Sequence, residues 1–118
     1  MDAAERKECI ATIRALPAKL ETAIGNLSEA QLDMPYGEGK WSPRQVVHHL
    51  ADAHMNAVSR MKLVFTENKP ILKPYDQDKW AVLADAKEYS VQVSMNIIKG
   101  LHERWTVFLD SLPEDAWV

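Results

Sequence analysis

The sequence predicts an all-α protein, and three observations support this fold class. Apolar residues recur at gaps of three and four in three long segments, as they do on one face of a helix. Alternating apolar and polar runs are scarce, and only four glycines occur. Capping patterns precede several of the apolar segments. A chain of 118 residues has room for one hydrophobic core, so we expect one domain over residues 1–118.

The composition excludes several classes of protein. Apolar residues make up 47% of the chain and charged residues 26%, as in ordinary globular proteins. The net charge of −3 gives no basic surface for nucleic acid. No apolar run approaches the roughly 18 residues that a membrane span needs. Cys9 is the single cysteine, so no internal disulfide is expected, which fits a reducing cytoplasm.

The first helix is predicted over the apolar stripe between residues 9 and 27. Pro17 interrupts this stripe, and a proline inside a helix removes one backbone hydrogen bond and crowds the preceding turn. We therefore expect either a kink near residues 15–17 or two abutting helices. Cys9 lies on the stripe and is expected to pack in the core as a small hydrophobic residue rather than to act as a nucleophile.

A short helical turn and a loop are expected next. Ser28 and Gln31 match a capping box, which predicts one helical turn over residues 29–32. Residues 33–40 carry no apolar period, and a proline and two glycines interrupt them. This segment is therefore predicted to be a loop.

The second long helix has the clearest start in the chain. Ser42 is the expected N-cap, Pro43 occupies the first helical position, and Gln45 completes a capping box. The helix is predicted to run to about Thr66. Its expected inward face consists of Val46, Leu50, Ala53, Ala57, Met61 and Val64.

A long connection over residues 68–79 follows this helix. It contains two prolines and has no apolar period. Connections of this length are often functional, although a segment that merely covers hydrophobic surface is the simpler interpretation. A short helix is expected around residues 78–83, with Trp80 directed inward.

The last clear helix is predicted to start near Tyr89 or Ser90 and to end before Pro113. Residues 111–115 then resemble another helix entry. The chain thus offers three long amphipathic helices, whereas bundles of this kind usually close with four. A three-helix bundle is the alternative.

The histidines are candidate metal ligands, but their spacing does not make a site. A metal site needs imidazoles that converge, and on one helix this requires a spacing of three or four. His48 and His49 point about 100° apart, and His49 and His54 about 140° apart. One helix therefore supplies one ligand at most, and His102 lies on another predicted helix.

His49 is the best placed of the three histidines on the second helix. Relative to the expected inward face, His48 points toward water and His54 lies within the apolar arc. His49 lies on the flank, which suits a ligand at the edge of a bundle cavity. Asp52, three residues later, could accept a hydrogen bond from the His49 ring. The simpler interpretations are a partly buried histidine bonded to a neighbour and a solvated helix charge.

A family resemblance adds to this interpretation. The segment Arg44-Gln45-Val46-Val47-His48-His49-Leu50-Ala51-Asp52 resembles the DinB/YfiT-like superfamily, and most closely its YfiT-type branch of metal-dependent hydrolases and bacillithiol S-transferases. Further matches extend in order over most of the chain. They are Gln31-Leu32-Asp33, Pro35-Tyr36, Trp41, Ala53-His54-Met55-Asn56, Arg60, Lys62-Leu63, Pro74-Tyr75-Asp76, Trp80 and Leu101-His102-Glu103-Arg104-Trp105.

The resemblance implies an up-down four-helix bundle that holds a divalent metal ion, zinc or nickel, between its helices. One ligand matches His49, and the family's other two form a His-x-x-x-His pair on the last helix. This sequence has no such pair, so we expect the chain to be truncated before the fourth helix. An open bundle with an exposed apolar groove should result, which a partner chain could cover. A homodimer is expected.

Two functions follow as hypotheses. For the intact protein, the resemblance implies a metal-dependent thiol S-transferase or hydrolase that acts on a small electrophile, with a bacillithiol-like thiol as one substrate. Substrate would enter near residues 70–80, and this chain alone would be inactive. The alternative is a non-enzymatic helical module for dimerisation or ligand binding.

Overall fold

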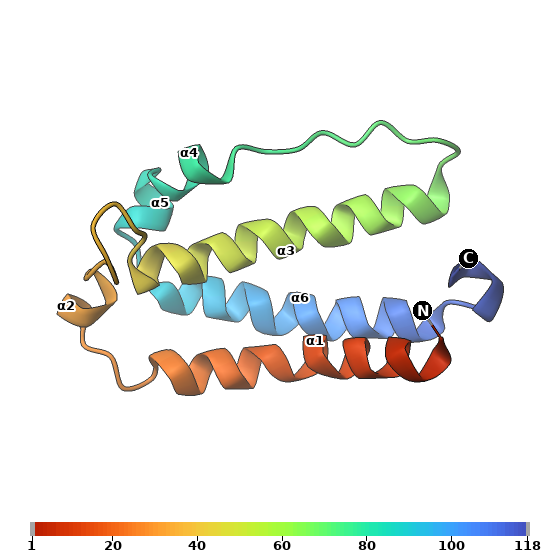
Figure 1. Ribbon diagram of the computed structural model, residues 1–118, viewed down its shortest axis with the longest axis horizontal. Helices are drawn as coiled ribbons and strands as arrows, with labels where there is room; N and C mark the ends of the chain where they lie inside the picture. The colour runs from red at the N-terminus through yellow and green to blue at the C-terminus, as the bar shows by residue number, and fades with distance from the viewer. Residues whose placement is uncertain (1, 118) are drawn as a thin grey trace.

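The computed structural model describes residues 2–117, and every regular element in that range is helical (Figure 1). The all-α prediction is therefore confirmed. The elements in order are α1 (Ala3–Ile24), α2 (Glu29–Leu32), α3 (Pro43–Thr66), α4 (Gln77–Ala81), α5 (Ala84–Lys87), α6 (Val91–Ser111) and the 3₁₀-helix η1 (Glu114–Trp117).

Helix α6 lies between α1 and α3 and packs against both of them (Figure 1). The segment after α3 runs back along the whole length of that helix before α4 begins. As a result α3 and α6 run in the same direction and α1 runs against them. This crossover departs from a simple up-and-down order. It also brings α4 and α5 onto the first half of α3.

Helix α1 is one helix, not two abutting ones, with Pro17 inside it. A capping box between Asp2 and Glu5 begins the helix. The expectation that Cys9 is a core residue was wrong, because Cys9 is exposed. Since α1 packs mainly on α6, only a narrow stripe of α1 around Ile10 is covered, and Cys9 lies beside that stripe.

Helix α3 begins and ends where the sequence predicts, with Ser42 and Gln45 forming the capping box. Its predicted inward face is confirmed in part, because Leu50, Ala57 and Met61 pack against buried core residues. The buried apolar residues are Val47, Ala51 and Val58, whereas Val64 is 52% exposed. Helix α6 covers one side of α3 while α4 and α5 cover another, so residues beside the predicted stripe are buried as well.

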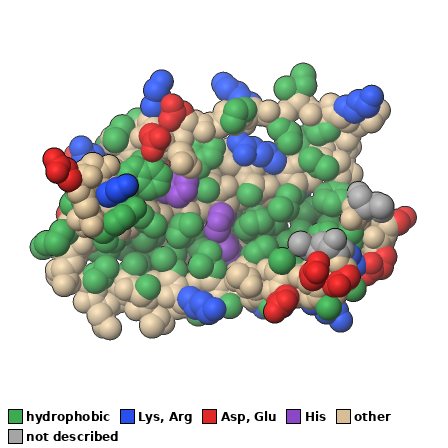
Figure 2. Space-filling model, viewed as in Figure 1, with side chains coloured by type: hydrophobic (Ala, Val, Ile, Leu, Met, Phe, Trp, Pro, Cys, Tyr) green, Lys and Arg blue, Asp and Glu red, His purple; other side chains and the backbone are tan. Residues whose placement is uncertain are grey.

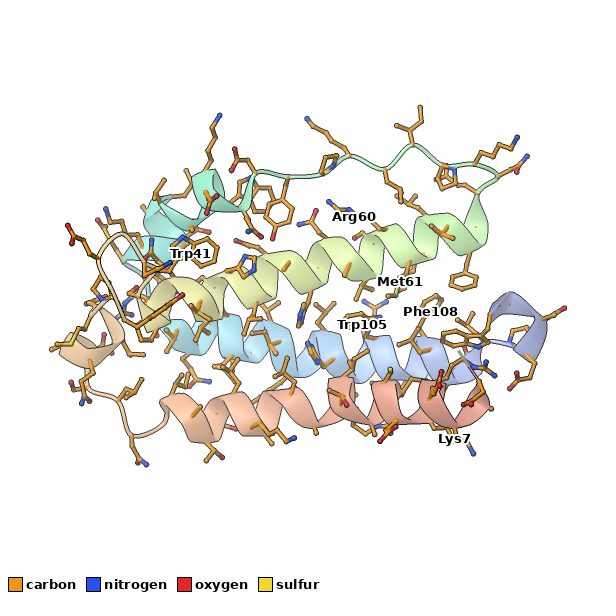
Figure 3. The ribbon with its side chains drawn as sticks, in the orientation of Figure 1. Lys7, Trp41, Arg60, Met61, Trp105 and Phe108 are labelled. Carbon is orange, nitrogen blue, oxygen red and sulfur yellow. The ribbon has the colours of Figure 1, made fainter. Side chains whose placement is uncertain are left out.

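Two apolar clusters form the core between the three long helices. The first lies toward the end of α3, where Met61 and Trp105 face each other across α3 and α6 (Figure 3). Its buried members are Ile10, Val58, Trp105 and Leu109. The second lies near the start of α3 and consists of Val47, Ala51, Met95 and Ile98.

A buried arginine joins three parts of the chain next to the second cluster. Arg44 is 2% exposed. Its guanidinium is paired with Glu29 of α2, donates to Asp33 at 2.7 Å, and donates to the Tyr89 carbonyl at 2.9 Å. These carboxylates raise the pKa of Arg44. The charge is therefore held by hydrogen bonds that fix α2 and the start of α6 against α3.

The connection after α3 places its aromatic residues differently from the prediction. Trp80 was expected to point inward, but it is 37% exposed. Its ring instead packs on Tyr75, with 4.4 Å between the centroids. Because α4 lies on the outside of α3, inward space at this position is already filled by Ala81, which is buried.

Figure 2 shows a broad apolar face across the three long helices, with histidine atoms in its middle. Such a face is larger than scattered surface hydrophobic residues would give. No helix within residues 2–117 combines the length and hydropathy that a membrane crossing requires.

Candidate metal centre on helix α3

The start of α3 fixes the direction of its side chains. The Ser42–Gln45 capping box holds the first turn of the helix. His49, Asp52 and Asn56 then lie three and four residues apart along it. They share one side of the helix. The crossover covers this side, since Arg60 on the same helix donates to the Lys73 carbonyl at 2.9 Å (Figure 3).

His49 has an imidazole without a hydrogen-bond partner in the described part of the chain. Its ring packs against Trp41, with 4.9 Å between the centroids and 58° between the planes. Trp41 therefore restrains the ring by contact and leaves both nitrogens without a protein partner. A neutral imidazole in this condition is available to bind a metal ion.

Asp52 lies one turn beyond His49, yet no hydrogen bond joins the two side chains among the described contacts. Burial raises the pKa of the Asp52 carboxyl, and the charge of Asp85 raises it further, while His48 and His49 lower it. The proposed role of Asp52 in orienting the His49 ring stays a prediction.

A cavity of about 550 Å³ lies between the crossover and α3. Its lining residues are Asn56, Lys73, Pro74, Tyr75, Asp76 and Trp80. The stacked rings of Tyr75 and Trp80 give it an apolar wall, and Asn56 gives it an amide. A cavity of this size, with apolar walls and a few polar groups, suits a small molecule.

The Tyr75 hydroxyl is the buried side-chain polar atom that lacks a hydrogen-bond partner within residues 2–117. Burial raises the pKa of Tyr75, and the negative charge of Asp52 raises it further. A buried hydroxyl without a partner costs about 1–3 kcal/mol. Sequence analysis named Tyr75 only as part of the matching segment Pro74-Tyr75-Asp76 and gave it no role, because the burial of its hydroxyl depends on the path of the crossover.

His48 does not face water, which corrects the prediction. It is 5% exposed, and it contacts Ser94 in the first turn of α6 and Tyr89 just before that helix. Its Nε2 donates to the Tyr89 carbonyl at 2.9 Å, because a carbonyl can only accept. Nδ1 then accepts from the Ser94 hydroxyl at 2.6 Å. Both nitrogens are used, so His48 is a structural residue.

His54 and His102 form a pair that spacing alone could not reveal. Nδ1 of His54 lies 2.7 Å from Nε2 of His102, and Nδ1 of His102 lies 2.7 Å from the Ile13 carbonyl. Burial lowers the pKa of His54, and the neighbouring His102 and His49 lower it further. The available sequence signal was Pro17, which leaves the Ile13 carbonyl without its helical partner.

Among the side chains that can bind a metal ion, His49 is the candidate ligand in the described residues. Within residues 2–117, no group of three or more histidine, cysteine, aspartate or glutamate side chains is placed to hold an ion. Among the histidines of α3, His49 has both nitrogens without hydrogen-bond partners and lies beside the cavity side of the helix. The other ligands of a three-histidine site are not supplied by these residues.

Comparison with known proteins places the chain in a family. The model of the DinB superfamily matches residues 4–117. The chain belongs to the DinB superfamily. Two relatives bear the name "Putative metal-dependent hydrolase". One, from Geobacillus thermodenitrificans, is 47% identical over 108 residues, and the other, YfiT from Bacillus subtilis, is 42% identical over 113 residues.

The match covers most of this chain but less of the relatives. It includes 92% and 96% of the chain, and 61% and 64% of the two relatives. The solved structure of Bacillus subtilis YfiT superposes with a TM-score of 0.94 at 40% identity, over 98% of this chain and 66% of that one. That structure is described as a probable metal-dependent hydrolase with an unusual four-helix bundle topology. The DinB/YfiT fold prediction is therefore confirmed.

Proposed function

We propose that the whole protein is a metal-dependent enzyme that transfers a small thiol, of the bacillithiol kind, to an electrophile or hydrolyses the electrophile. The observation that carries this proposal is His49, whose two ring nitrogens have no protein partner and which lies on the side of α3 that faces the cavity. The names of the relatives support metal dependence.

The residues of this chain have distinct roles in the proposed reaction. His49 would hold a divalent ion, zinc or nickel, and Trp41 would restrain its ring. Such an ion supplies Lewis acidity, which lowers the pKa of a bound thiol or water. Asp52 would balance the positive charge near His49. The cavity under the crossover would bind the electrophile between Tyr75, Trp80 and Asn56.

The test is thiol transfer by the protein loaded with zinc or nickel. Cysteine and 1-chloro-2,4-dinitrobenzene serve as the probe thiol and electrophile, and release of chloride is followed. Activity should disappear after dialysis against EDTA and return with the added ion. Transfer that continues unchanged after chelation would refute the metal mechanism. Hydrolysis without transfer would select the hydrolase alternative.

A second candidate function is a helical module that dimerises. Figure 2 shows a broad apolar face, which favours this function, and exposed apolar residues such as Val64 leave further apolar surface uncovered. The proposed homodimer would cover part of this face. Sedimentation equilibrium of the protein and of Val64→Glu tests this candidate. A monomer at micromolar concentration would exclude it, and a dimer that Val64→Glu dissociates would support it.

A further inference from the structure

The three histidines of α3 differ in how many ring nitrogens the protein uses. His48 has both nitrogens bonded, to Ser94 and to the Tyr89 carbonyl. His54 has one nitrogen bonded, since Nδ1 contacts His102 and no partner is found for Nε2 among the described residues. His54 therefore has one unbonded ring nitrogen in a ring that is held in place. His48, whose two ring nitrogens are both bonded, is the matched control in experiments on that nitrogen.

The tautomer of His54 follows from a backbone carbonyl that lies four residues before Pro17. Pro17 has no N–H, so the Ile13 carbonyl lacks its usual helical donor. Nδ1 of His102 donates to that carbonyl at 2.7 Å, which leaves Nε2 of neutral His102 as an acceptor. Nδ1 of His54 must therefore donate to it, at 2.7 Å. Nε2 of His54 then carries a lone pair.

This lone pair reaches the surface of the apolar face. His54 is half-buried, and its Nε2 is not among the fully buried side-chain atoms that lack a partner in residues 2–117, so part of this nitrogen is accessible. The ring edge is held by Trp105, at 5.4 Å between centroids. His54 lies about 7.5 Å further along the axis of α3 than His49 and about 140° around it. The two rings are still near enough for the charge of His49 to lower the pKa of His54.

We propose that Nε2 of His54 is the proton acceptor for the thiol or water that attacks the electrophile, and that His102 is its positioning residue. This inference rests on the proposed function. The S–H or O–H bond breaks, its proton moves to Nε2, and the electron pair stays on sulfur or oxygen. That atom bonds to the electrophilic carbon as the leaving group departs with its electrons. The proton then leaves His54 for the leaving group or solvent.

The surroundings of the pair keep His54 neutral until it takes this proton. His102 faces it from α6 and His49 lies on its own helix, and no carboxylate bonds to either member of the pair. His102 is 1% exposed and is held between the Ile13 carbonyl and His54. The charged residues near the far side of His102 are Arg14, Glu21, Lys99 and Glu103.

The first test uses the metal-free protein and needs no activity. Nitrogen-15 spectra should show Nδ1 protonated and Nε2 bare in His54, with Nε2 taking the proton on acidification. Diethyl pyrocarbonate, which acylates bare and accessible imidazole nitrogens, should modify His54 and spare His48. Adding zinc should protect His49 and leave His54 reactive. A proton on Nε2 of His54 at neutral pH, or no acylation of His54, would overturn the proposal.

The second test is the pH dependence of thiol transfer with cysteine and 1-chloro-2,4-dinitrobenzene. His54→Gln keeps a donor toward His102 but removes the base, so kcat/KM should fall by about 10²-fold or more. The acidic limb of the pH profile, which is the fall in kcat/KM as His54 takes up a proton, should vanish in this variant. His102→Gln should shift that limb, and His48→Gln should leave it in place. Retention of the limb in His54→Gln would refute the proton-acceptor role. If no variant or wild-type protein is active, the proposed function fails, and the first test still decides the state of His54.

Discussion

Nδ1 of His102 donates a hydrogen bond to the carbonyl oxygen of Ile13 across 2.7 Å, which joins α6 to α1. The carbonyl is available because Pro17, four residues later, has no N–H to offer it. His54 extends the connection to α3, at 2.7 Å from His102. One helix-breaking residue therefore makes possible a polar connection through all three long helices.

The substitution Pro17→Ala tests this relationship. The alanine restores an N–H four residues after Ile13 and removes the proline penalty of about 3 kcal/mol. Because the new N–H competes with His102 for the carbonyl, we expect a net gain in the free energy of unfolding of roughly 1–2 kcal/mol. Urea denaturation of Pro17→Ala, His102→Gln and the double variant measures the coupling between the two sites. Additive effects would show that Pro17 and His102 are independent.

The buried hydrogen bonds and ion pairs of Arg44 should contribute far more to stability than an exposed ion pair. Removing the Arg44 side chain takes away charge-assisted hydrogen bonds to Asp33 and to the Tyr89 carbonyl, so Arg44→Ala should cost about 2–4 kcal/mol. Arg14→Ala is the matched control, because Arg14 and its partner Asp110 are both more than half exposed. It should cost less than about 1 kcal/mol. Equal losses for the two variants would contradict this account.

Stability should fall on mild acidification because of His54. Burial lowers the pKa of folded His54 below the ordinary value of 6.5, so the unfolded chain binds the proton first as pH falls. The stabilisation is present above pH 6.5 and is lost as pH falls from there toward the folded pKa. One proton gives a slope of at most about 1.4 kcal/mol per pH unit. Thermal melts from about pH 7.5 down to about pH 5.5 should show a smaller slope in His54→Gln, and an unchanged slope would contradict the assignment.

Asp52 should make stability depend on pH in the opposite direction to His54. Burial raises the pKa of its folded carboxyl, so the unfolded chain ionises first as pH rises and the folded state is relatively disfavoured above that pKa. Asp52→Asn should therefore raise the free energy of unfolding at about pH 7, by less than about 1 kcal/mol, and have no effect near about pH 3. Asp78→Asn, at an exposed position on α4, is the control. A loss of stability at neutral pH would mean that the carboxylate is needed in the fold.

Local sequence signals predicted the helices well. The Ser42–Gln45 capping box and Pro43 placed the start of α3 correctly, because capping depends on residues within one turn. Pro113 placed the end of α6 in the same way. The long crossover could be recognised by its prolines, but its path along α3 could not, since that path depends on distant contacts such as the one between Arg60 and Lys73.

Burial and pairing were less predictable. The predicted burial of Cys9, His48 and Trp80 was wrong, because the burial of each residue depends on which helix covers which side of its own element. His48 is covered by the start of α6, 41 residues or more away in sequence. The pairing of His54 with His102 spans 48 residues and also requires the carbonyl that Pro17 frees on a third helix. Periodicity within one helix contains none of this information.

The central claim is that His49 is a metal ligand, and metal content measures it most directly. The whole protein is purified from medium with added zinc or nickel, dialysed, and assayed by inductively coupled plasma mass spectrometry. His49→Ala should lose the bound ion, whereas His48→Gln and His54→Gln, checked as folded by circular dichroism, should retain it. An equal amount of ion in wild-type protein and folded His49→Ala would contradict the account.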